Sequence, residues 1–191
     1  MERRDFLRLP LALTGVVLAT GAMGIQPASA ATTKTLKGLG YGGTDAAALK
    51  RLKSLNLDWY YGWGAKYPTI PTNFIPMIRD NRKLDRDLRD LTLQLPVTKA
   101  KVLLGFNEPD HPKQANLTVD QALALWPRLE ATGLRLGSPA TISPNAEWMN
   151  EFMTKAKKTG RRVDFVTMHC YQWPKASSFF TKLDTLHDKW G

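Results

Sequence analysis

The sequence predicts an α/β protein in which helices cover a parallel sheet. Short apolar segments of strand length alternate along the chain with longer segments whose apolar residues recur at helical spacing. Their connections are long enough for right-handed crossovers between parallel strands. The apolar run before Asn107 lacks the polar alternation of a half-exposed strand, which indicates burial on both faces. The predicted strands lie at 57–63, 74–78, 102–106, 134–140 and 163–173.

Residues 1–30 are expected to be a twin-arginine signal peptide. Arg3 and Arg4 stand in a charged N-terminal region, an apolar run covers 9–22, and Ala28-Ser29-Ala30 is a small-residue cleavage site. The apolar run is too short for a spanning helix and contains Pro10. The sequence therefore predicts export through the twin-arginine route to the periplasm, the cell wall or the medium. No stable membrane anchor is expected, and 31–191 are expected to form one domain.

The chain has 191 residues with 43% hydrophobic content, enough to bury a core, and a formal net charge of +10. Lys and Arg are scattered over helical segments without a nucleic-acid motif, so attraction to an anionic cell surface is favoured over nucleic-acid binding. Cys170 is the single cysteine, which excludes an internal disulfide. His111, His169 and His187 lack metal-ligand spacing, and no cofactor is implied.

The first half of the chain predicts two helices. A glycine-rich stretch at 38–43 lacks the ending of a phosphate loop and is interpreted as a flexible lead-in. Thr44 is the predicted N-cap of a helix that ends at Asn56. The second helix is predicted to end before Pro96, and its apolar face consists of Leu84, Leu88, Leu91 and Leu95.

Three more helices are predicted in the second half. Thr118 and Gln121 form a capping box at the start of one, and Ser143 is the predicted N-cap of the next. The last covers 177–189. In the second of these helices Trp148, Phe152 and Ala156 are expected to point inward. The apolar residues of the other two are Ala122, Leu125, Trp126 and Leu129 in the first, and Phe180, Leu183, Leu186 and Trp190 in the third.

The strand at 57–63 carries an aromatic cluster. The period of two places Trp59, Tyr61 and Trp63 on one face. A packed aromatic core is the favoured interpretation for Trp59. Tyr61 and Trp63 lie nearer the carboxyl end of the strand, where flat rings with a polar edge suit stacking on a sugar.

The strand at 102–106 ends in a polar sequence. Pro109 favours extended geometry at Glu108 and ends the strand, so Asn107 and Glu108 are predicted at its carboxyl end, where folds of this class build their sites. A catalytic acid would lie there. The alternative is that Glu108 caps the next turn or pairs with one of the many Lys and Arg side chains.

Two further candidates follow from the strand at 163–173. His169 and Tyr171 share a face and lie near its carboxyl end. A lone histidine in a strand is more often a hydrogen-bonded core residue than a catalyst. Its expected position on the rim of the same site favours a functional role.

The sequence at 103–110, Leu-Leu-Gly-Phe-Asn-Glu-Pro-Asp, resembles the signature of the glycosyl hydrolase catalytic core of the alkali-sensitive linkage protein type, glycoside hydrolase family 128 of endo-β-1,3-glucanases. The stretches at 59–63, 74–77, 114–116, 137–140 and 169–171 match in the same order. The resemblance runs from about Leu55 to the last residue.

The resemblance implies a (β/α)₈ TIM barrel, a fold that typically takes about 250 residues. This chain supplies about five strands and is expected to be the N-terminal part, incomplete at the C-terminus. Glu108 matches the family's acid/base, and Asn107 matches a residue that hydrogen-bonds the sugar hydroxyl beside the reacting carbon. The implied substrate-binding residues are Trp59, Tyr61, Trp63, His169, Tyr171 and Trp173.

The first functional hypothesis is a secreted glycoside hydrolase that cleaves β-glucan, favouring β-1,3 links, by a retaining two-carboxylate mechanism. In the family the nucleophile is a glutamate on a strand beyond 169–171, so the chain as given is expected to be inactive and to self-associate if truncated. One alternative is a non-catalytic glucan-binding or cell-surface remnant. A basic adhesion protein would instead bind in a salt-sensitive way. A Ser/His/Asp hydrolase is disfavoured because Ser138 lies outside a nucleophile elbow.

Overall fold

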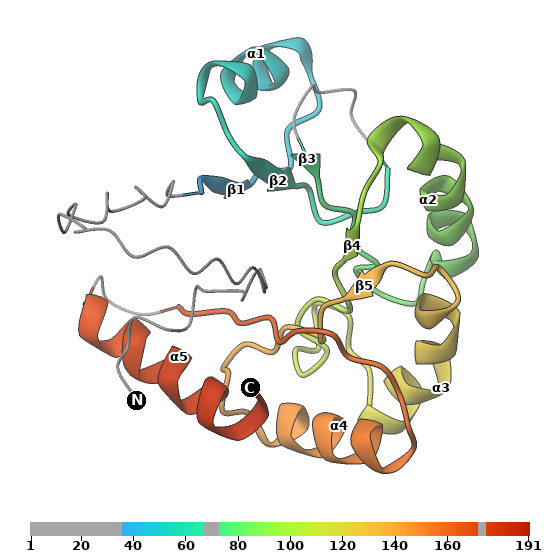
Figure 1. The fold of residues 1–191 in the computed structure, drawn as a ribbon. Helices are drawn as coiled ribbons and strands as arrows, with labels where there is room; N and C mark the ends of the chain where they lie inside the picture. Colours follow the sequence, from blue (N-terminus) through green and yellow to red (C-terminus); the bar gives the residue numbers. More distant parts are fainter. Residues whose placement is uncertain (1–35, 67–72, 172–174) are drawn as a thin grey trace, which may run out of the picture. The chain divides into compact units, whose positions relative to one another are not determined.

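The computed structural model describes residues 36–66, 73–171 and 175–191 (Figure 1). The predicted signal peptide at 1–30 and the candidate Trp173 lie outside these residues. None of the helices in the described ranges is long and apolar enough to cross a bilayer.

Strands and helices alternate along much of this part of the chain. The strands are β1 (Gly38–Gly40), β2 (Trp59–Tyr61), β3 (Asn73–Phe74), β4 (Val102–Leu103) and β5 (Arg135–Leu136). The helices are α1 (Ala46–Ser54), α2 (Leu84–Thr98), α3 (Val119–Glu130), α4 (Glu147–Lys158) and α5 (Ala176–Trp190).

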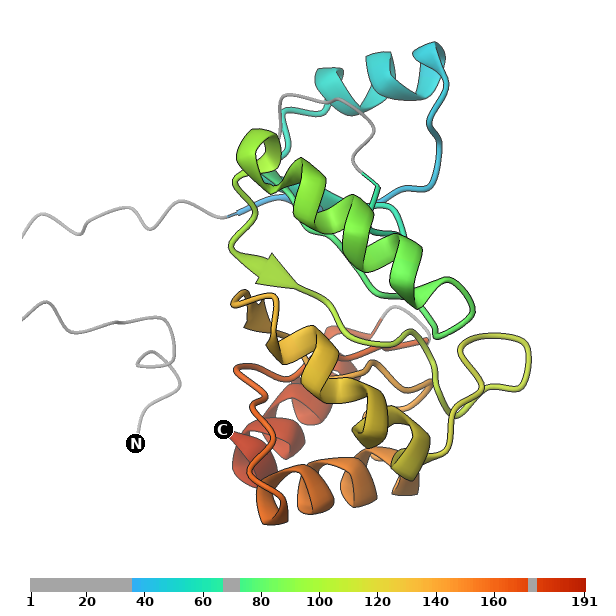
Figure 2. The same ribbon diagram turned by 90° about the vertical axis from the view of Figure 1, so that its right-hand side faces the viewer.

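All strand pairs are parallel and follow chain order. β1, β2 and β3 form one sheet, and β4 and β5 form another. Single parallel bridges from Met77 to Leu104 and from Gly137 to Phe165 continue the same order. Figures 1 and 2 show α2 and α3 on one side of these strands. The α/β prediction is confirmed, and the arrangement is consistent with part of a barrel.

The glycine-rich lead-in was a wrong prediction, because its first residues form strand β1. Gly38 pairs with Trp59, and Gly40 pairs with Tyr61. A Cβ atom on Gly38 would lie only 1.9 Å from the Trp59 ring. Glycine is therefore needed where this strand passes beneath an aromatic side chain, and the absence of side chains concealed the strand in the sequence.

Two helix starts differ from the prediction. Asp45, not Thr44, caps α1 by accepting a hydrogen bond from the Ala48 N–H. α4 begins at Glu147 instead of next to Ser143, because the Ser143 carbonyl is engaged in a turn.

The predicted end of α2 is wrong, and the predicted cap of α3 is confirmed. α2 runs through Pro96 to Thr98, and Lys99 ends it with a left-handed φ of 50°. Pro96 lies in the last turn, where its fixed φ suits a helix and a single N–H is lost. The predicted capping box of Thr118 and Gln121 is present at α3.

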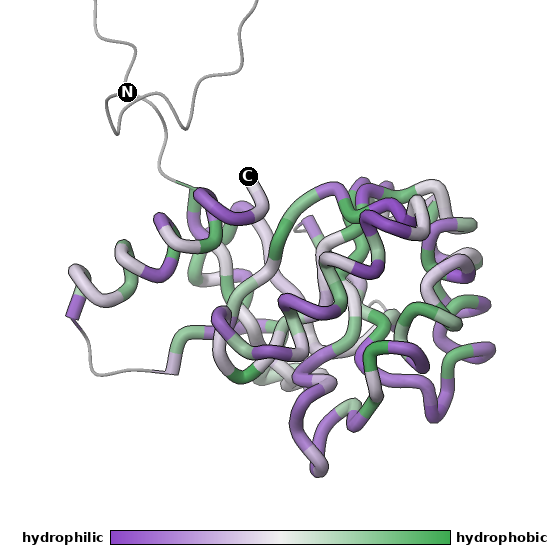
Figure 3. Tube along the Cα trace, turned by 90° about the horizontal axis from the view of Figure 1, so that it is seen from below, coloured by the Kyte–Doolittle hydropathy of each residue, from purple (hydrophilic) through white to green (hydrophobic). Residues whose placement is uncertain are grey.

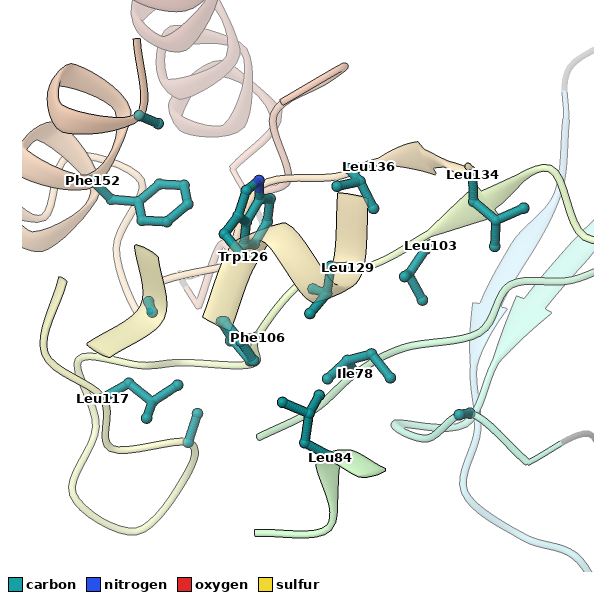
Figure 4. Packing of buried hydrophobic residues seen from close by; sticks show 14 of the residues in the cluster. Ile78, Leu84, Leu103, Phe106, Leu117, Trp126, Leu129, Leu134, Leu136 and Phe152 are labelled. Carbon is teal, nitrogen blue, oxygen red and sulfur yellow. The ribbon is translucent and has the colours of Figure 1, made fainter. Parts of the chain in front are cut away.

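The main core lies between the strands and helices α2, α3 and α4 (Figure 4). Trp126 is fully buried at its centre, and its ring meets Phe106 and Phe152 edge-on at centroid distances of 6.1 and 5.1 Å. Its Nε1 donates to the Arg162 carbonyl at 2.8 Å. The helix faces predicted to be apolar supply much of this core, including Leu84, Leu91, Ala122, Trp126, Leu129, Phe152 and Ala156.

Hydrophilic and hydrophobic residues alternate along the helices (Figure 3). In helix α5 only part of the apolar set is buried, since Leu186 is its buried residue while Phe180 and Leu183 are exposed. The spacing of apolar residues identifies a face that could be buried, but another element must pack on that face before it becomes core.

Candidate active site

Glu108, His169 and Tyr171 lie together beyond the strand contacts of β4 and of Phe165. The predicted strand at 163–173 is wrong for its described part, because only Phe165 makes a parallel bridge there. Glu108 follows the bridge that joins Asn107 to Ala140 and is only 6% exposed. Its Oε1 lies 2.8 Å from His169 Nδ1 and accepts a hydrogen bond from the Tyr171 hydroxyl at 2.7 Å. Among the described residues, none is hydrogen-bonded to Glu108 Oε2. One carboxyl oxygen is thus held in place by two side chains.

The backbone at Glu108 is left-handed, with φ at 44°, which overturns the extended geometry predicted from Pro109. Non-glycine residues seldom adopt this conformation, and tertiary contacts must hold it. Here the Glu108 N–H donates to the Ala140 carbonyl at 2.7 Å while the carboxyl group is bound on the other side. The strand contact outweighs the local preference of the residue before a proline.

Tyr171 has a raised pKa in this cluster. Burial of its hydroxyl end, the hydrogen bond to Glu108 and the charges of Glu108 and Tyr61 raise the pKa of Tyr171 to about 12. The ring itself is largely exposed, at 70% of the residue surface. Burial also raises the pKa of Tyr61. Tyr171 therefore donates to Glu108 as a neutral phenol, and Tyr61 lies near enough to act on it electrostatically.

A pH titration is expected to show this environment. An unfolded tyrosine ionises near pH 10, at about its reference pKa, whereas Tyr171 in the folded protein ionises at about pH 12. Because the folded pKa is raised, the stabilisation is complete below pH 10 and is lost as the pH rises through about 12. Subtracting the phenolate absorbance titration of Tyr171→Phe from that of the wild type isolates this group. A difference curve centred near pH 10 would refute the contact.

The aromatic residues of β2 lie on two faces. Tyr60 is the buried ring, packed against Phe74, whereas Trp59 is only partly buried, so the core interpretation of Trp59 was wrong. Trp59 and Tyr61 are stacked at 6.5 Å, and Tyr61 meets Trp63 edge-on at 5.0 Å. Trp63 is 38% exposed. Tyr61 and Trp63 thus form an aromatic surface in edge-on contact at the end of β2.

The sequence reasoning missed a polar network beside Glu108. Arg79 Nη2 donates to Gln114 Oε1 at 2.8 Å, and Asn107 Nδ2 lies 3.4 Å from the same oxygen. Asn107 is 97% buried, with 3% exposed. Arg79 follows the predicted strand 74–78, so its place at a strand's carboxyl end was the available signal.

The other carboxylates considered from sequence have structural partners or lie elsewhere. Asp110 accepts from the Ile142 N–H at 3.1 Å, and Asp164 pairs with Arg162 and accepts from the Leu136 N–H. Glu147 is in the first turn of α4. Within the described ranges, Glu108 has no second carboxylate among its hydrogen-bonded partners.

Other site chemistries find no support in the described residues. The described residues contain no group of three or more His, Cys, Asp or Glu side chains that could hold a metal ion. Ser138 Oγ is hydrogen-bonded to Thr167 and to the Pro139 carbonyl, and His169 is bound to Glu108 instead. A serine–histidine pair of the hydrolase type is thus not formed by Ser138 and His169.

Residues 38–191 match the family model described as glycosyl hydrolase catalytic core. The chain is also similar to alkali-sensitive linkage protein 1 of Schizosaccharomyces pombe (strain 972 / ATCC 24843), with 28% identity over 138 residues. That match covers 68% of this chain and 24% of the relative, so the chain spans about a quarter of that protein's length.

Solved structures agree with this match. A family 128 (subgroup I) endo-β-1,3-glucanase from Amycolatopsis mediterranei, in complex with laminaripentaose, gives a TM-score of 0.71 at 30% identity, covering 82% of this chain and 68% of that one. A subgroup II endo-β-1,3-glucanase from Sorangium cellulosum gives 0.62 at 27% identity, covering 80% and 69%. A subgroup III curdlan-specific exo-β-1,3-glucanase from Blastomyces gilchristii, in complex with glucose, gives 0.65 at 25% identity, covering 77% and 67%.

Proposed function

This chain belongs to the glycosyl hydrolase catalytic core family, and we propose that it is a glycoside hydrolase of β-1,3-glucan. The observation that carries the proposal is Glu108, a buried carboxyl group at a strand's carboxyl end with one oxygen bound by His169 and Tyr171. The laminari-oligosaccharides bound by similar glucanases support a glucan substrate. The proposed fold is a (β/α)₈ barrel of which the described parallel strands are consecutive members.

In the proposed mechanism Glu108 is the acid/base of a retaining hydrolase. Its free oxygen, Oε2, carries the proton that passes to the glycosidic oxygen as the C–O bond breaks. A second carboxylate, about 5 to 5.5 Å away, attacks the anomeric carbon and forms the glycosyl-enzyme. Glu108 then takes a proton from water, and the resulting hydroxide oxygen displaces the enzyme carboxylate. Asn107 is proposed to hydrogen-bond a sugar hydroxyl during these steps.

Among the described residues, Asp110 and Asp164 have other hydrogen-bond partners and Glu147 lies in the first turn of α4, so residues 31–191 alone are expected not to hydrolyse laminarin. Without a nucleophile the covalent intermediate cannot form. The exposed apolar side chains of α5, including Phe179 and Phe180, are expected to favour self-association. A reducing-sugar assay beside size-exclusion chromatography tests both expectations. Clear turnover by a monomer would overturn them and would make Asp110 and Glu147 the first carboxylates to replace.

Trp63 is proposed to stack on the glucan. Trp63→Ala is expected to weaken laminari-oligosaccharide binding about fivefold to tenfold, the scale of one aromatic contact, with little change in melting temperature because the ring is partly exposed. Leu93→Ala on α2 is the control, since this exposed apolar side chain lies outside the aromatic surface. Titration calorimetry measures binding per folded molecule. If the variant unfolds while folded molecules bind normally, Trp63 is a packing residue.

A glucan-binding protein without catalysis is the second candidate. It is favoured by the aromatic pair at Tyr61 and Trp63, together with hydrogen-bond partners of Glu108 that include no carboxylate among the described residues. Both candidates predict oligosaccharide binding, and only the hydrolase predicts turnover once the nucleophile is present.

Export is part of the proposal. Arg3 and Arg4 are proposed to direct residues 1–30 to the twin-arginine route, with cleavage after Ala30. Mass spectrometry of the exported protein should give Ala31 as the first residue, and replacing both arginines with lysine should retain the precursor in the cell.

A further inference from the structure

The polar network at Arg79, Gln114 and Asn107 sets the orientation of an amide beside Glu108. A guanidinium group has only hydrogen-bond donors, so the Gln114 atom that lies 2.8 Å from Arg79 Nη2 must be the carbonyl oxygen. The Asn107 atom that lies 3.4 Å from the same oxygen must then be the amide nitrogen, because two oxygens would repel each other. Arg79 therefore determines, through Gln114, which atom Asn107 turns away from Gln114.

The atom turned away is Asn107 Oδ1. This oxygen is shielded from solvent and accepts no hydrogen bond from the described residues. Arg79 Nε is likewise buried without an acceptor in the same part of the chain. A buried acceptor that lacks a hydrogen-bond donor destabilises the folded protein. A hydrogen bond from a bound ligand would remove this penalty. A hydroxyl group can donate to such an oxygen.

The backbone holds Asn107 between the same two neighbours. Its N–H donates to the Arg79 carbonyl at 2.9 Å, and its carbonyl accepts from the N–H of Ala115, next to Gln114, at 3.2 Å. The loop that carries Gln114 is tied to Glu108, whose carbonyl accepts from the His111 N–H. Main chain and side chain are thus fixed together, one residue before the proposed acid/base.

We infer that Arg79 and Gln114 are positioning residues that fix Asn107 as an acceptor for one hydroxyl of the bound sugar. This inference rests on the proposed function for the nature of the ligand. Discrimination follows from it, because a sugar that lacks that hydroxyl leaves the buried Oδ1 unpaired. Neither Arg79 nor Gln114 needs to touch the sugar for this effect.

The first experiment measures the orientation without any ligand. In nitrogen-15 NMR spectra, the Asn107 side-chain amide is identified by its loss in Asn107→Ala, and its exchange with water is followed. Gln114→Met removes the acceptor and is expected to speed exchange at least about tenfold, whereas Gln114→Glu keeps an acceptor oxygen and is expected to preserve slow exchange. Equal exchange rates in wild type and Gln114→Met would overturn the inference.

The second experiment measures binding of laminari-oligosaccharides in which single hydroxyls are replaced by hydrogen. The wild type should lose affinity most, about threefold to tenfold, at one hydroxyl position. In Asn107→Ala, Gln114→Met and Arg79→Met this position should no longer matter, and Gln114→Glu should restore its effect. The double variant Arg79→Met/Gln114→Met should discriminate no worse than either single variant, because both act through one amide.

The outcomes separate the two proposals. If the wild type binds no laminari-oligosaccharide, the proposed function fails, while the exchange experiment still decides the orientation of Asn107. If the wild type binds but the variants keep the full discrimination, the positioning role is wrong. Additive losses of stability without a change in discrimination would assign Arg79 and Gln114 to folding alone.

Discussion

Replacing Glu108 with glutamine is expected to lower the rate of β-glucan hydrolysis by about 10²- to 10⁴-fold, the range of general acid catalysis. Glutamine has the size of glutamate, and its carbonyl oxygen can still accept from Tyr171 and His169, so the fold should be kept. Its amide cannot deliver the proton that Oε2 of Glu108 would supply. Oligosaccharide binding, measured by calorimetry, should therefore remain near the wild-type value.

The measurement needs a form with both carboxylates. If the 191-residue chain does not hydrolyse laminarin, residues 38–191 can replace the matching part of the Amycolatopsis glucanase, which the chain resembles with a TM-score of 0.71. An aryl glucoside whose leaving group needs no protonation serves as the matched substrate, and its cleavage should suffer less from Glu108→Gln. A folded variant that hydrolyses laminarin at the wild-type rate would remove Glu108 from the mechanism.

Truncating Trp126 to alanine is expected to lower the free energy of unfolding by about 3 to 5 kcal/mol. The side chain is fully buried, and its loss removes edge-on contacts with Phe106 and Phe152 and leaves the Arg162 carbonyl without the indole donor. Since domains of this size are stable by only about 5 to 15 kcal/mol, much of the margin would be lost. Urea denaturation followed by circular dichroism measures the change.

Trp63→Ala is the matched control for Trp126→Ala. It removes the same side chain from a partly exposed position and should shift the urea midpoint only slightly. Trp126→Phe should lose less than the alanine variant, because the ring contacts are partly kept while the hydrogen bond to Arg162 is not. Equal midpoints for wild type and Trp126→Ala would show that the core tolerates the cavity.

The helical faces could be predicted because each is a local pattern. Leu84 and Leu91 lie seven positions apart and therefore face the same way on any helix, whatever it packs against. The capping box of Thr118 and Gln121 is local too, and it forms as predicted. Such a pattern does not decide burial: Phe180 and Leu183 of α5 stay exposed, since periodicity does not state whether another element covers the face.

The candidate site could be predicted only in part. Strand ends at the same edge of a parallel sheet placed Glu108, His169 and Tyr171 in one region. Their hydrogen bonds join residues 61 and 63 positions apart, and the register between the segments that specifies these bonds cannot be read from local sequence. The link from Arg79 to Gln114 spans 35 positions and went unnoticed for the same reason.

By itself the sequence determined the α/β class, the approximate positions of the helices and of β2 to β5, and the Asn-Glu-Pro-Asp motif that marks the family, because these depend on residues near one another in the chain. Only the tertiary structure decided that Gly38–Gly40 forms a strand under the Trp59 ring, that Glu108 is held at a φ of 44°, and that Asn107 turns its oxygen away from Gln114. Each of these depends on a neighbouring segment whose contact outweighs the local preference of the chain.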